Sequence, residues 1–268
     1  MKKTFINLST YFLPILLLSL VSCSSRRDLI VDDLYGAVEQ TQIKSNSYII
    51  ELADKSALSG SARANIRAEL KGLQSEEFDY IINSTYPDKL RFEVYVPAAN
   101  RLLILAQSKG NTINITYPES GKVVVLDKFR DDLETIVGLP FTASELIHVY
   151  LGNYPFYANN SDHGIASLNM YDFNTTDRNN SNDFQSDRVI VAQLNNGSKG
   201  VARLSSGGKV LLLDYENSKG ELYQLTYEYD ALSSFNCPKS IRIDTEDGYA
   251  NLIFKSCATR VPYNPALY

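Results

Sequence analysis

The chain of 268 residues contains no tryptophan, two methionines and two histidines, His148 and His163. Neither histidine belongs to a cluster of cysteines or carboxylates with the spacing of a zinc site. The sequence also lacks a G-x-S-x-G nucleophile elbow. Gly207-Gly208-Lys209 stands without the rest of a phosphate-binding loop and is instead predicted to be a hairpin turn. We therefore expect no catalytic constellation, no metal and no cofactor, and we predict that the protein is not an enzyme.

Long apolar runs are also scarce, and the one that stands out lies near the N-terminus, at residues 12–20. It follows Lys2 and Lys3 and is too short to span a bilayer, as in a secretory signal. The residues directly after it, Leu20-Val21-Ser22-Cys23, resemble the lipobox of bacterial lipoproteins. That resemblance implies cleavage before Cys23 and acylation of Cys23 itself. Several acyl chains on one residue would anchor the protein durably in a membrane. The alternative is an ordinary secretory signal with a chance cysteine.

The residue after this cysteine and the charge of the body bear on localisation and partners. Ser24 stands where aspartate is the inner-membrane retention signal of enterobacterial lipoproteins, so the resemblance implies the periplasmic face of the outer membrane. The formal net charge is -5, and removal of the two signal lysines makes it about -7. An acidic body argues against nucleic acid as a partner and leaves the acyl anchor as the main membrane contact.

Two further cysteines, Cys237 and Cys257, flank a predicted hairpin. An even number of cysteines in an exported protein is typical of a disulfide. A two-residue turn gives the hairpin a good apolar face but sets Cys237 opposite Ala258. A three-residue turn sets the two cysteines opposite each other but also opposes two lysines. The hydrophobic pattern favours the first register, in which a disulfide needs a bulge or a frayed end, and the sequence leaves both states open.

Alternating apolar residues dominate the body and predict antiparallel strands. Leu90, Phe92 and Val94 face one way, while Arg91 and Glu93 face the other. Turn residues separate further runs of the same kind, which is typical of a meander. The predicted strands cover residues 90–96, 103–106, 113–117, 123–126, 189–194, 201–204, 209–215, 222–229, 240–245 and 249–255.

Helical patterns interrupt the strands. A first helix is predicted after Asp28. In the middle of the chain, Leu133 and Ile136 lie on one stripe of a second helix that ends at Gly138. A capping box at residues 142–145 begins a third helix, which runs to Gly152. Two short helices are thus expected between two blocks of strands.

We expect one domain at residues 31–260, after a signal peptide at 1–22 and an acylated tether at 23–30. A polar stretch at 157–188 lacks the periodicity of a core element and is predicted to be an insertion. Residues 261–268 are predicted to form a loose C-terminal tail.

The central and C-terminal segments resemble those of the LolB family of outer-membrane lipoprotein receptors. The central resemblance lies in residues 136–142 and then in Glu145-Leu146 and Tyr150-Leu151-Gly152. The C-terminal resemblance lies in residues 238–243 and 247–254, and the lipobox agrees with both. The order of lipobox, strands, two helices and strands carries the resemblance more than any single motif.

The resemblance implies an α+β, mainly β fold: an unclosed antiparallel β barrel with a helical lid, whose cavity takes the acyl chains of lipoproteins. It also implies a LolA-like periplasmic carrier as a partner, and we expect a monomer. The concave wall is predicted to include Phe92, Val94, Ile113 and Ile115, and the lid Leu133, Ile136 and Ile147. Each of these side chains has an alternative reading as a plain core residue.

One loop departs from the family. A protruding loop in LolB exposes a leucine that helps to deliver lipoproteins to the membrane, and the matching loop here is Pro97-Ala98-Ala99-Asn100. Alanine buries far less apolar surface than leucine. The resemblance therefore supports the fold and the outer-membrane localisation better than it supports insertion of lipoproteins into the membrane. Three functions therefore stay open: a LolB-like receptor, a lipid-binding or envelope-assembly lipoprotein with another cargo, and a structural lipoprotein filled by its own side chains.

Overall fold

A computed structural model of the chain describes residues 61–71, 76–85, 89–127, 131, 133, 141–155, 165–172, 188–195, 197–205, 208–230, 237–246, 248–261, 264 and 266. These residues form one antiparallel sheet of thirteen strands and one short helix, α4. The strands are β1 (Ser61–Lys71), β2 (Glu76–Thr85), β3 (Lys89–Val96), β4 (Arg101–Lys109), β5 (Thr112–Tyr117), β6 (Lys122–Asp127), β7 (Ile165–Asp172), β8 (Arg188–Leu194), β9 (Lys199–Leu204), β10 (Val210–Glu216), β11 (Leu222–Glu228), β12 (Ser240–Asp244) and β13 (Tyr249–Val261).

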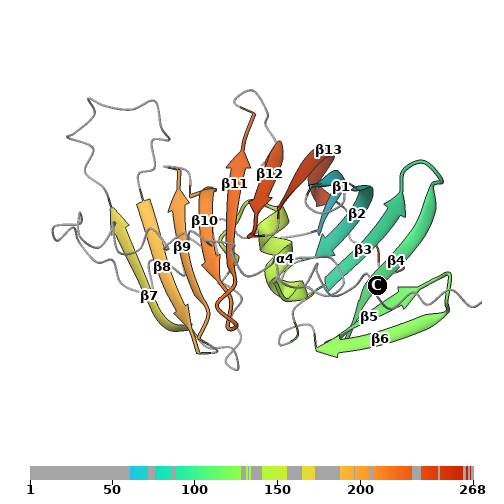
Figure 1. The fold of residues 1–268 in the computed structure, drawn as a ribbon, viewed down its shortest axis with the longest axis horizontal. Helices are drawn as coiled ribbons and strands as arrows, with labels where there is room; N and C mark the ends of the chain where they lie inside the picture. The colour runs from blue at the N-terminus through green and yellow to red at the C-terminus, as the bar shows by residue number, and fades with distance from the viewer. Residues whose placement is uncertain are drawn as a thin grey trace, which may run out of the picture.

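The sheet consists of two meanders that meet in its middle. Strands β1 to β6 follow one another outwards to one edge, and β13 back to β7 follow one another to the other edge. The first and last strands, β1 and β13, pair along their length and join the two meanders. Figure 1 shows the sheet curving around α4, with β6 and β7 at its two free edges. The predicted unclosed antiparallel sheet with a helix against it is confirmed.

Side-chain alternation explains which face of the sheet became the core. In β11, Tyr223, Leu225 and Tyr227 are buried, whereas Gln224 and Thr226 between them are only half-buried. Neighbouring strands repeat this pattern in register, so the buried side chains of both meanders join one hydrophobic cluster. A sheet that buries one face in this way must bend or be covered, and here it does both.

The strand predictions were wrong at four strands. No strand was expected at β1 or β2, because β1 alternates small Ala64 and Ala68 with arginine and glutamate, residues that also favour helices. The polar stretch at 157–188 contains the strand β7, which has a single neighbour, β8, and so needs little apolar sequence. Strand β13 extends to Val261, six residues beyond the predicted end at Lys255, because β1 supplies it with a partner.

The helix α4 (Ala143–Tyr150) confirms the predicted capping box. Glu145 N–H donates to the Thr142 hydroxyl at 3.2 Å, and Thr142 N–H donates to the Glu145 carboxylate at 2.9 Å. The helix predicted before it is described at two positions only, and Leu133 does not behave as a helical residue there. Its N–H donates to the Phe141 carbonyl at 2.9 Å, which is not a bond between successive helical turns. The helix predicted after Asp28 lies outside the described residues.

The outer face of the joint between the two meanders carries an ion-pair network. Lys255 Nζ of β13 lies 2.7 Å from Asp79 Oδ1 of β2, and Arg67 Nε of β1 lies 3.3 Å from the same oxygen. Burial alone would raise the pKa of Asp79, but the hydrogen bonds from Lys255 and Arg67 outweigh it and lower that pKa. Three strands are thus tied at one carboxylate.

In the described part of the chain, no helix has the length and apolar character needed to cross a bilayer.

Candidate functional site

The candidate site is the concave face of the sheet, where α4 rests. A row of aromatic rings links the first meander to this helix. Tyr80 of β2 stacks on Phe92 of β3 with ring centroids 5.1 Å apart, and Phe92 stacks on Tyr150 of α4 at 6.3 Å. Burial raises the pKa of Tyr80 to about 12, so its hydroxyl stays neutral in the core. The helix therefore lies on the same face of β3 as Phe92.

A second row of rings links the start of α4 to the other meander. Phe141, directly before the helix, stacks on Tyr215 of β10 at 5.2 Å, and Tyr215 lies 6.2 Å from Tyr223 of β11. The helical segment thus contacts strands from both halves of the sheet. It spans the concave face instead of covering one meander alone.

The structure brings most of the predicted acyl-chain residues together on this face. Phe92 of β3 pairs with Ala106 of β4, which pairs with Ile115 of β5, so the three side chains lie side by side. All the predicted residues that the structure describes are buried, at 4% exposure or less, and belong to one cluster: Phe92, Val94, Ile113, Ile115, Leu133 and Ile147. Ile136 lies outside the described residues.

The C-terminal end of α4 is fixed to β10 by backbone contacts. Gly152 has φ +66°, a left-handed conformation that favours glycine, and its carbonyl accepts from Val210 N–H at 3.1 Å. The Tyr229 hydroxyl donates to the Val210 carbonyl at 2.8 Å and lies 3.4 Å from the Gly152 carbonyl. Burial raises the pKa of Tyr229 above its ordinary value, which keeps this donor protonated.

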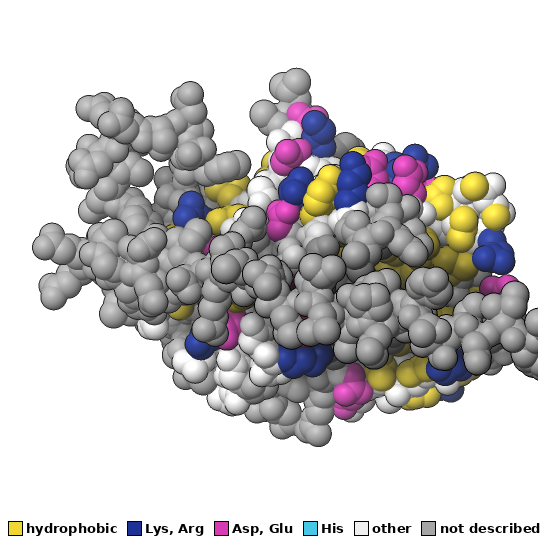
Figure 2. Space-filling view, viewed as in Figure 1, with side chains coloured by type: hydrophobic (Ala, Val, Ile, Leu, Met, Phe, Trp, Pro, Cys, Tyr) yellow, Lys and Arg dark blue, Asp and Glu magenta, His cyan; other side chains and the backbone are white. Residues whose placement is uncertain are grey.

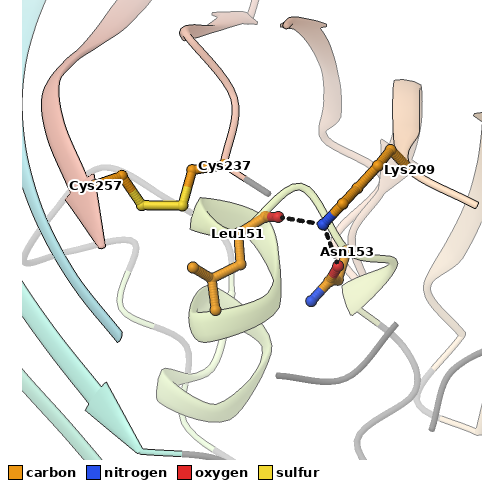
Figure 3. Close-up of a disulfide and its surroundings, with 5 residues drawn as sticks. All are labelled: Leu151, Asn153, Lys209, Cys237 and Cys257. Carbon is orange, nitrogen blue, oxygen red and sulfur yellow. Dashed lines mark hydrogen bonds between the residues drawn. A yellow bond between two sulfur atoms is a disulfide. The ribbon is translucent and has the colours of Figure 1, made fainter. Parts of the chain in front are cut away.

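A lysine from the predicted turn before β10 also reaches this end of the helix (Figure 3). Lys209 Nζ donates to the Leu151 carbonyl at 3.3 Å and to Asn153 Oδ1 at 3.2 Å. A cation near the last carbonyls of a helix is favourable, because these carbonyls lack partners within the helix. Burial lowers the pKa of Lys209 to about 8. Lys209 is thus a partner of the last turn of the helix.

Several titratable groups are buried on this face. Burial lowers the pKa of His148 in α4 to about 4, so the imidazole is neutral at neutral pH. Burial also raises the pKa of Tyr227 in β11 well above its ordinary value. The Tyr227 hydroxyl makes no hydrogen bond within the described part of the chain. Leu225, two residues earlier in β11, and Ile241, its partner in β12, are fully buried, so the surroundings of this hydroxyl are apolar. Tyr227 therefore offers a polar group inside an apolar surface.

Cys237 and Cys257 form a disulfide, with their Cα atoms 6.4 Å apart (Figure 3). Neither register considered for this hairpin was correct, because the turn has four residues, at 245–248. Its closing contact is the bond from Thr245 N–H to the Gly248 carbonyl at 2.8 Å. Ile241 consequently pairs with Leu252, whereas a two-residue turn would pair it with Phe254. The shift of two residues leaves the same side chains inside.

A β-bulge in β13 explains how Cys257 reaches the core face. Asn65 of β1 pairs with Ser256, but the next residue of β1 pairs with Phe254, so Lys255 is the extra residue. The bulge reverses the alternation beyond it, and Cys257 therefore pairs with buried Ala64. Lys255 in turn points outwards to Asp79, as described above. The bulge that a disulfide requires is present.

The loop at 97–100 joins β3 to β4 and forms an exposed turn. Ala98, Ala99 and Asn100 are exposed, and Pro97 is half-buried. Asn100 has φ +46°, a conformation that asparagine tolerates better than most residues. The neighbouring turn between β5 and β6 is linked to it by an ion pair between Arg101 and Glu119 at 3.5 Å. Cys23 lies outside the described residues.

Sequence reasoning did not identify Lys209 or Tyr229 as partners of α4, nor the buried hydroxyl of Tyr227. The first two contact residues that lie more than fifty positions away in the chain. The only sequence signal was local: Gly152 as a helix end, and two glycines before Lys209 as a turn. Gly208 has φ +80° in that turn, and Ser205 N–H donates to the Lys209 carbonyl at 2.8 Å, so the turn itself is confirmed.

The fold is similar to that of solved proteins. A LolA superfamily protein from Nitrosomonas europaea matches 84% of this chain and 98% of its own, with 12% sequence identity and a TM-score of 0.50. A domain from Vibrio parahaemolyticus named for outer-membrane lipoprotein sorting matches 81% and 94%, with 13% identity and a TM-score of 0.51. A DUF1329 family protein from Desulfovibrio piger matches 82% and 95%, with 12% identity and a TM-score of 0.50. The sequence matches no protein-family model and no curated protein. At these identities the similarity establishes the fold.

Proposed function

Because the chain has the unclosed sheet found in LolA superfamily proteins, we propose that it is a lipid-anchored outer-membrane protein that binds acyl chains on its concave face. Cys23 carries the anchor, and the cargo is a lipoprotein that a periplasmic carrier hands over for insertion into the membrane. One observation carries the proposal: buried apolar side chains of both meanders converge on a short helix that spans the concave face.

The arrangement suits the binding of a ligand that must later be released. A short helix on an open sheet can move away from an apolar face without breaking the strand ladder. The polar contacts of α4 with the sheet described here lie at its C-terminal end, at Lys209 and Tyr229, whereas its N-terminal end is held by ring stacking. Binding and release of this kind need differential affinity and no bond chemistry, so the proposal includes no enzyme activity.

The hydroxyl of Tyr227 supports a ligand with both an apolar and a polar part. An unpaired buried hydroxyl costs about 1–3 kcal/mol, a cost that a ligand with an ester or amide carbonyl would remove. The acylated end of a lipoprotein has such carbonyls beside its chains. We therefore place the polar end of the ligand near β11.

A handover assay tests the receptor role. The carrier is loaded with an acylated lipoprotein and mixed with the soluble Cys23→Ala form, and the protein that holds the cargo is then identified. Transfer to this chain supports the receptor, and no transfer from a demonstrably loaded carrier to a folded protein removes it.

A matched pair of variants tests the concave face itself. Ala106→Phe adds bulk between Phe92 and Ile115, whereas Gln107→Phe adds the same ring one residue along β4, on the opposite face. We expect Ala106→Phe to reduce binding of a fluorescent fatty acid at least tenfold and Gln107→Phe to leave it unchanged. Thermal melts confirm that both variants are folded. Equal binding by both variants would show that acyl chains do not occupy this face.

A second candidate function is favoured by the exposed loop at 97–100. A loop with two exposed alanines offers little apolar surface for membrane insertion. A lipid-binding or envelope-assembly lipoprotein that never inserts its cargo would not need such surface. In that case the fatty acid would bind and the carrier would transfer nothing.

A further inference from the structure

The free edge at β6 is unusual because natural sheets protect such edges. Charges, prolines, bulges and short lengths normally prevent an edge strand from pairing with another chain. The middle of β6 is Val123-Val124-Val125, and its pairing with β5 has no register shift. Val123 is 53% exposed and Val125 59%, more than any other large hydrophobic side chain in the described residues. At the other free edge, β7 has a register shift between Ile165 and Ser167.

In the part of the chain that the structure describes, the backbone of β6 presents hydrogen-bonding groups without a partner to this edge. Asp127 N–H donates to Asp131 Oδ2 at 2.8 Å, and the Asp127 carbonyl accepts from Asp131 N–H at 3.0 Å. Both groups of Asp127 therefore point away from β5. Because direction alternates along a strand, the N–H and C=O groups of Val125 and Val123 point the same way. Asp131 closes one end of the edge, so within the described residues the groups left without a partner are those of these two valines.

We propose that β6 pairs antiparallel with β6 of a second copy of this chain. In the register that satisfies the free groups, Val123 of each copy lies opposite Val125 of the other, and Val124 lies opposite its own counterpart on a two-fold axis. The two Val123–Val125 pairs each exchange both of their hydrogen bonds. Their side chains also meet on the outer face, where β5 offers them only Thr116 and Asn114 as cross-strand neighbours.

Charge at the two ends of β6 favours a second copy over an unrelated strand. Lys122 begins the strand, and Asp127 with the exposed Asp131 ends it. An antiparallel self-pairing brings Lys122 of one copy to the acidic end of the other, and does so twice because the contact is isologous. The same two-fold axis, perpendicular to the sheet, keeps the concave faces on one side. The dimer thus has one continuous concave surface. A dimer differs from the monomer expected from the sequence, and this proposal does not depend on the proposed function.

Cysteine cross-linking in the Cys23→Ala form tests the register. The Cα atoms of opposed residues in an antiparallel pair are about 4.5–5.5 Å apart, which a disulfide can bridge. We expect Val124→Cys to cross-link to itself. Val123→Cys and Val125→Cys should cross-link when mixed and not when alone. Asn111→Cys, at the exposed turn between β4 and β5, is the control for random collision. Cross-linking no greater than that of Asn111→Cys would overturn the proposal.

Sedimentation of the same form provides a second readout. Val125→Pro removes an N–H that faces the edge and leaves the bonds to β5 intact, and Val125→Lys adds a protecting charge if proline impairs folding. Both should be monomeric at concentrations at which the parent and Val125→Thr dimerise. A parent that stays monomeric into the millimolar range contradicts the dimer. If instead Val125→Lys weakens binding to phosphatidylethanolamine–phosphatidylglycerol vesicles, the valines contact a membrane and the proposal fails.

Discussion

The hydroxyl of Tyr229 occupies the space that a side chain at Gly152 would need. A Cβ atom added at Gly152 would overlap the Tyr229 hydroxyl oxygen and would lie 3.1 Å from the ring carbon that bears it. The left-handed conformation of Gly152 and the position of Tyr229 are therefore two parts of one contact. This contact holds the end of α4 against β10.

The contact between Gly152 and Tyr229 predicts that substitutions at these two positions have non-additive effects on the free energy of unfolding. Gly152→Ala should destabilise the protein by about 2–4 kcal/mol, of which about 1 kcal/mol is the left-handed backbone and the rest is the overlap. Tyr229→Phe removes the overlapping oxygen, so Gly152→Ala should cost about 1 kcal/mol less in that background. Urea unfolding measures both values. Gly121→Ala is the control, since Gly121 has φ +67° and nothing within 4 Å of the added atom. If Gly152→Ala and Gly121→Ala lower the free energy of unfolding equally, the overlap with Tyr229 does not explain the effect at Gly152.

The disulfide should contribute substantially to stability. Cys237 and Cys257 are 20 residues apart, and a bridge that closes a loop of this size typically adds about 3 kcal/mol. Replacing both cysteines by alanine should lower the free energy of unfolding by about that amount without changing the fold. The measurement is urea unfolding of the parent and the double variant, both in the Cys23→Ala form, with a thiol titration of the unfolded parent. Two reactive thiols in the parent would show that the bridge is not formed.

Acid should destabilise the protein through His148. The pKa of His148 is about 4 in the folded state and about 6.5 when unfolded, so between these values the unfolded chain binds more protons. Stability is thus complete above about pH 6.5 and falls as the pH drops towards 4, by about 3 kcal/mol in total. His148→Leu should remove this part of the slope. Unfolding free energies at pH 7 and pH 4.5 test this, and equal losses in both proteins would exclude His148 as the cause.

The hydroxyl of Tyr227 should cost stability and favour a ligand. Tyr227→Phe removes a buried hydroxyl without a hydrogen bond in the described residues, so stability should rise by about 1 kcal/mol. Affinity for an acyl ester should fall in the same variant. Tyr95→Phe is a control with an existing bond, because the Tyr95 hydroxyl donates to the Glu93 carboxylate at 2.6 Å. It should lose stability and keep its affinity. A loss of stability in Tyr227→Phe would show that its hydroxyl has a partner.

A larger side chain in the loop at 97–100 should strengthen membrane contact. Ala98→Leu adds apolar surface worth about 2 kcal/mol if it is fully buried in lipid, which corresponds to an increase in vesicle affinity of about thirtyfold. Asn111→Leu adds a leucine to an exposed turn at the opposite end of the sheet. Flotation with vesicles compares the two variants of the Cys23→Ala form. Equal increases would show that the loop has no special position relative to the membrane.

The sequence predicted those elements whose signals are local. The alternation of Leu90, Phe92 and Val94 was sufficient for β3, and the capping box at Thr142 was sufficient for the start of α4. Prediction from the sequence failed where neighbouring strands stabilise a strand whose own side chains are only weakly apolar. In β1, the buried positions are filled by Ala64, Ile66 and Ala68, and these are apolar enough only because β2 and β13 cover both sides.

The site follows the same rule. Alternation identified the buried residues of β3 and β5, since each strand's pattern can be read alone. The contacts that position α4 could not be found in this way. Lys209, directly before β10, and Tyr229, directly after β11, reach the helix from positions that are remote in sequence, and no periodicity connects them to Leu151 or Gly152. The bulge at Lys255 was equally hidden, because a bulge is defined by the partner strand.

The pairing of β1 with β13 also sets the order in which the protein would fold during the export that the proposed function requires. A chain that crosses the inner membrane N-terminus first delivers β1 long before Tyr249–Val261 arrives. Until then the first meander has open edges at both β1 and β6. Its most non-local contact is therefore also its last, and the unfinished half-sheet is exposed to misassociation for the whole of translocation. A periplasmic chaperone would be needed most in that interval, before the sheet is joined in its middle.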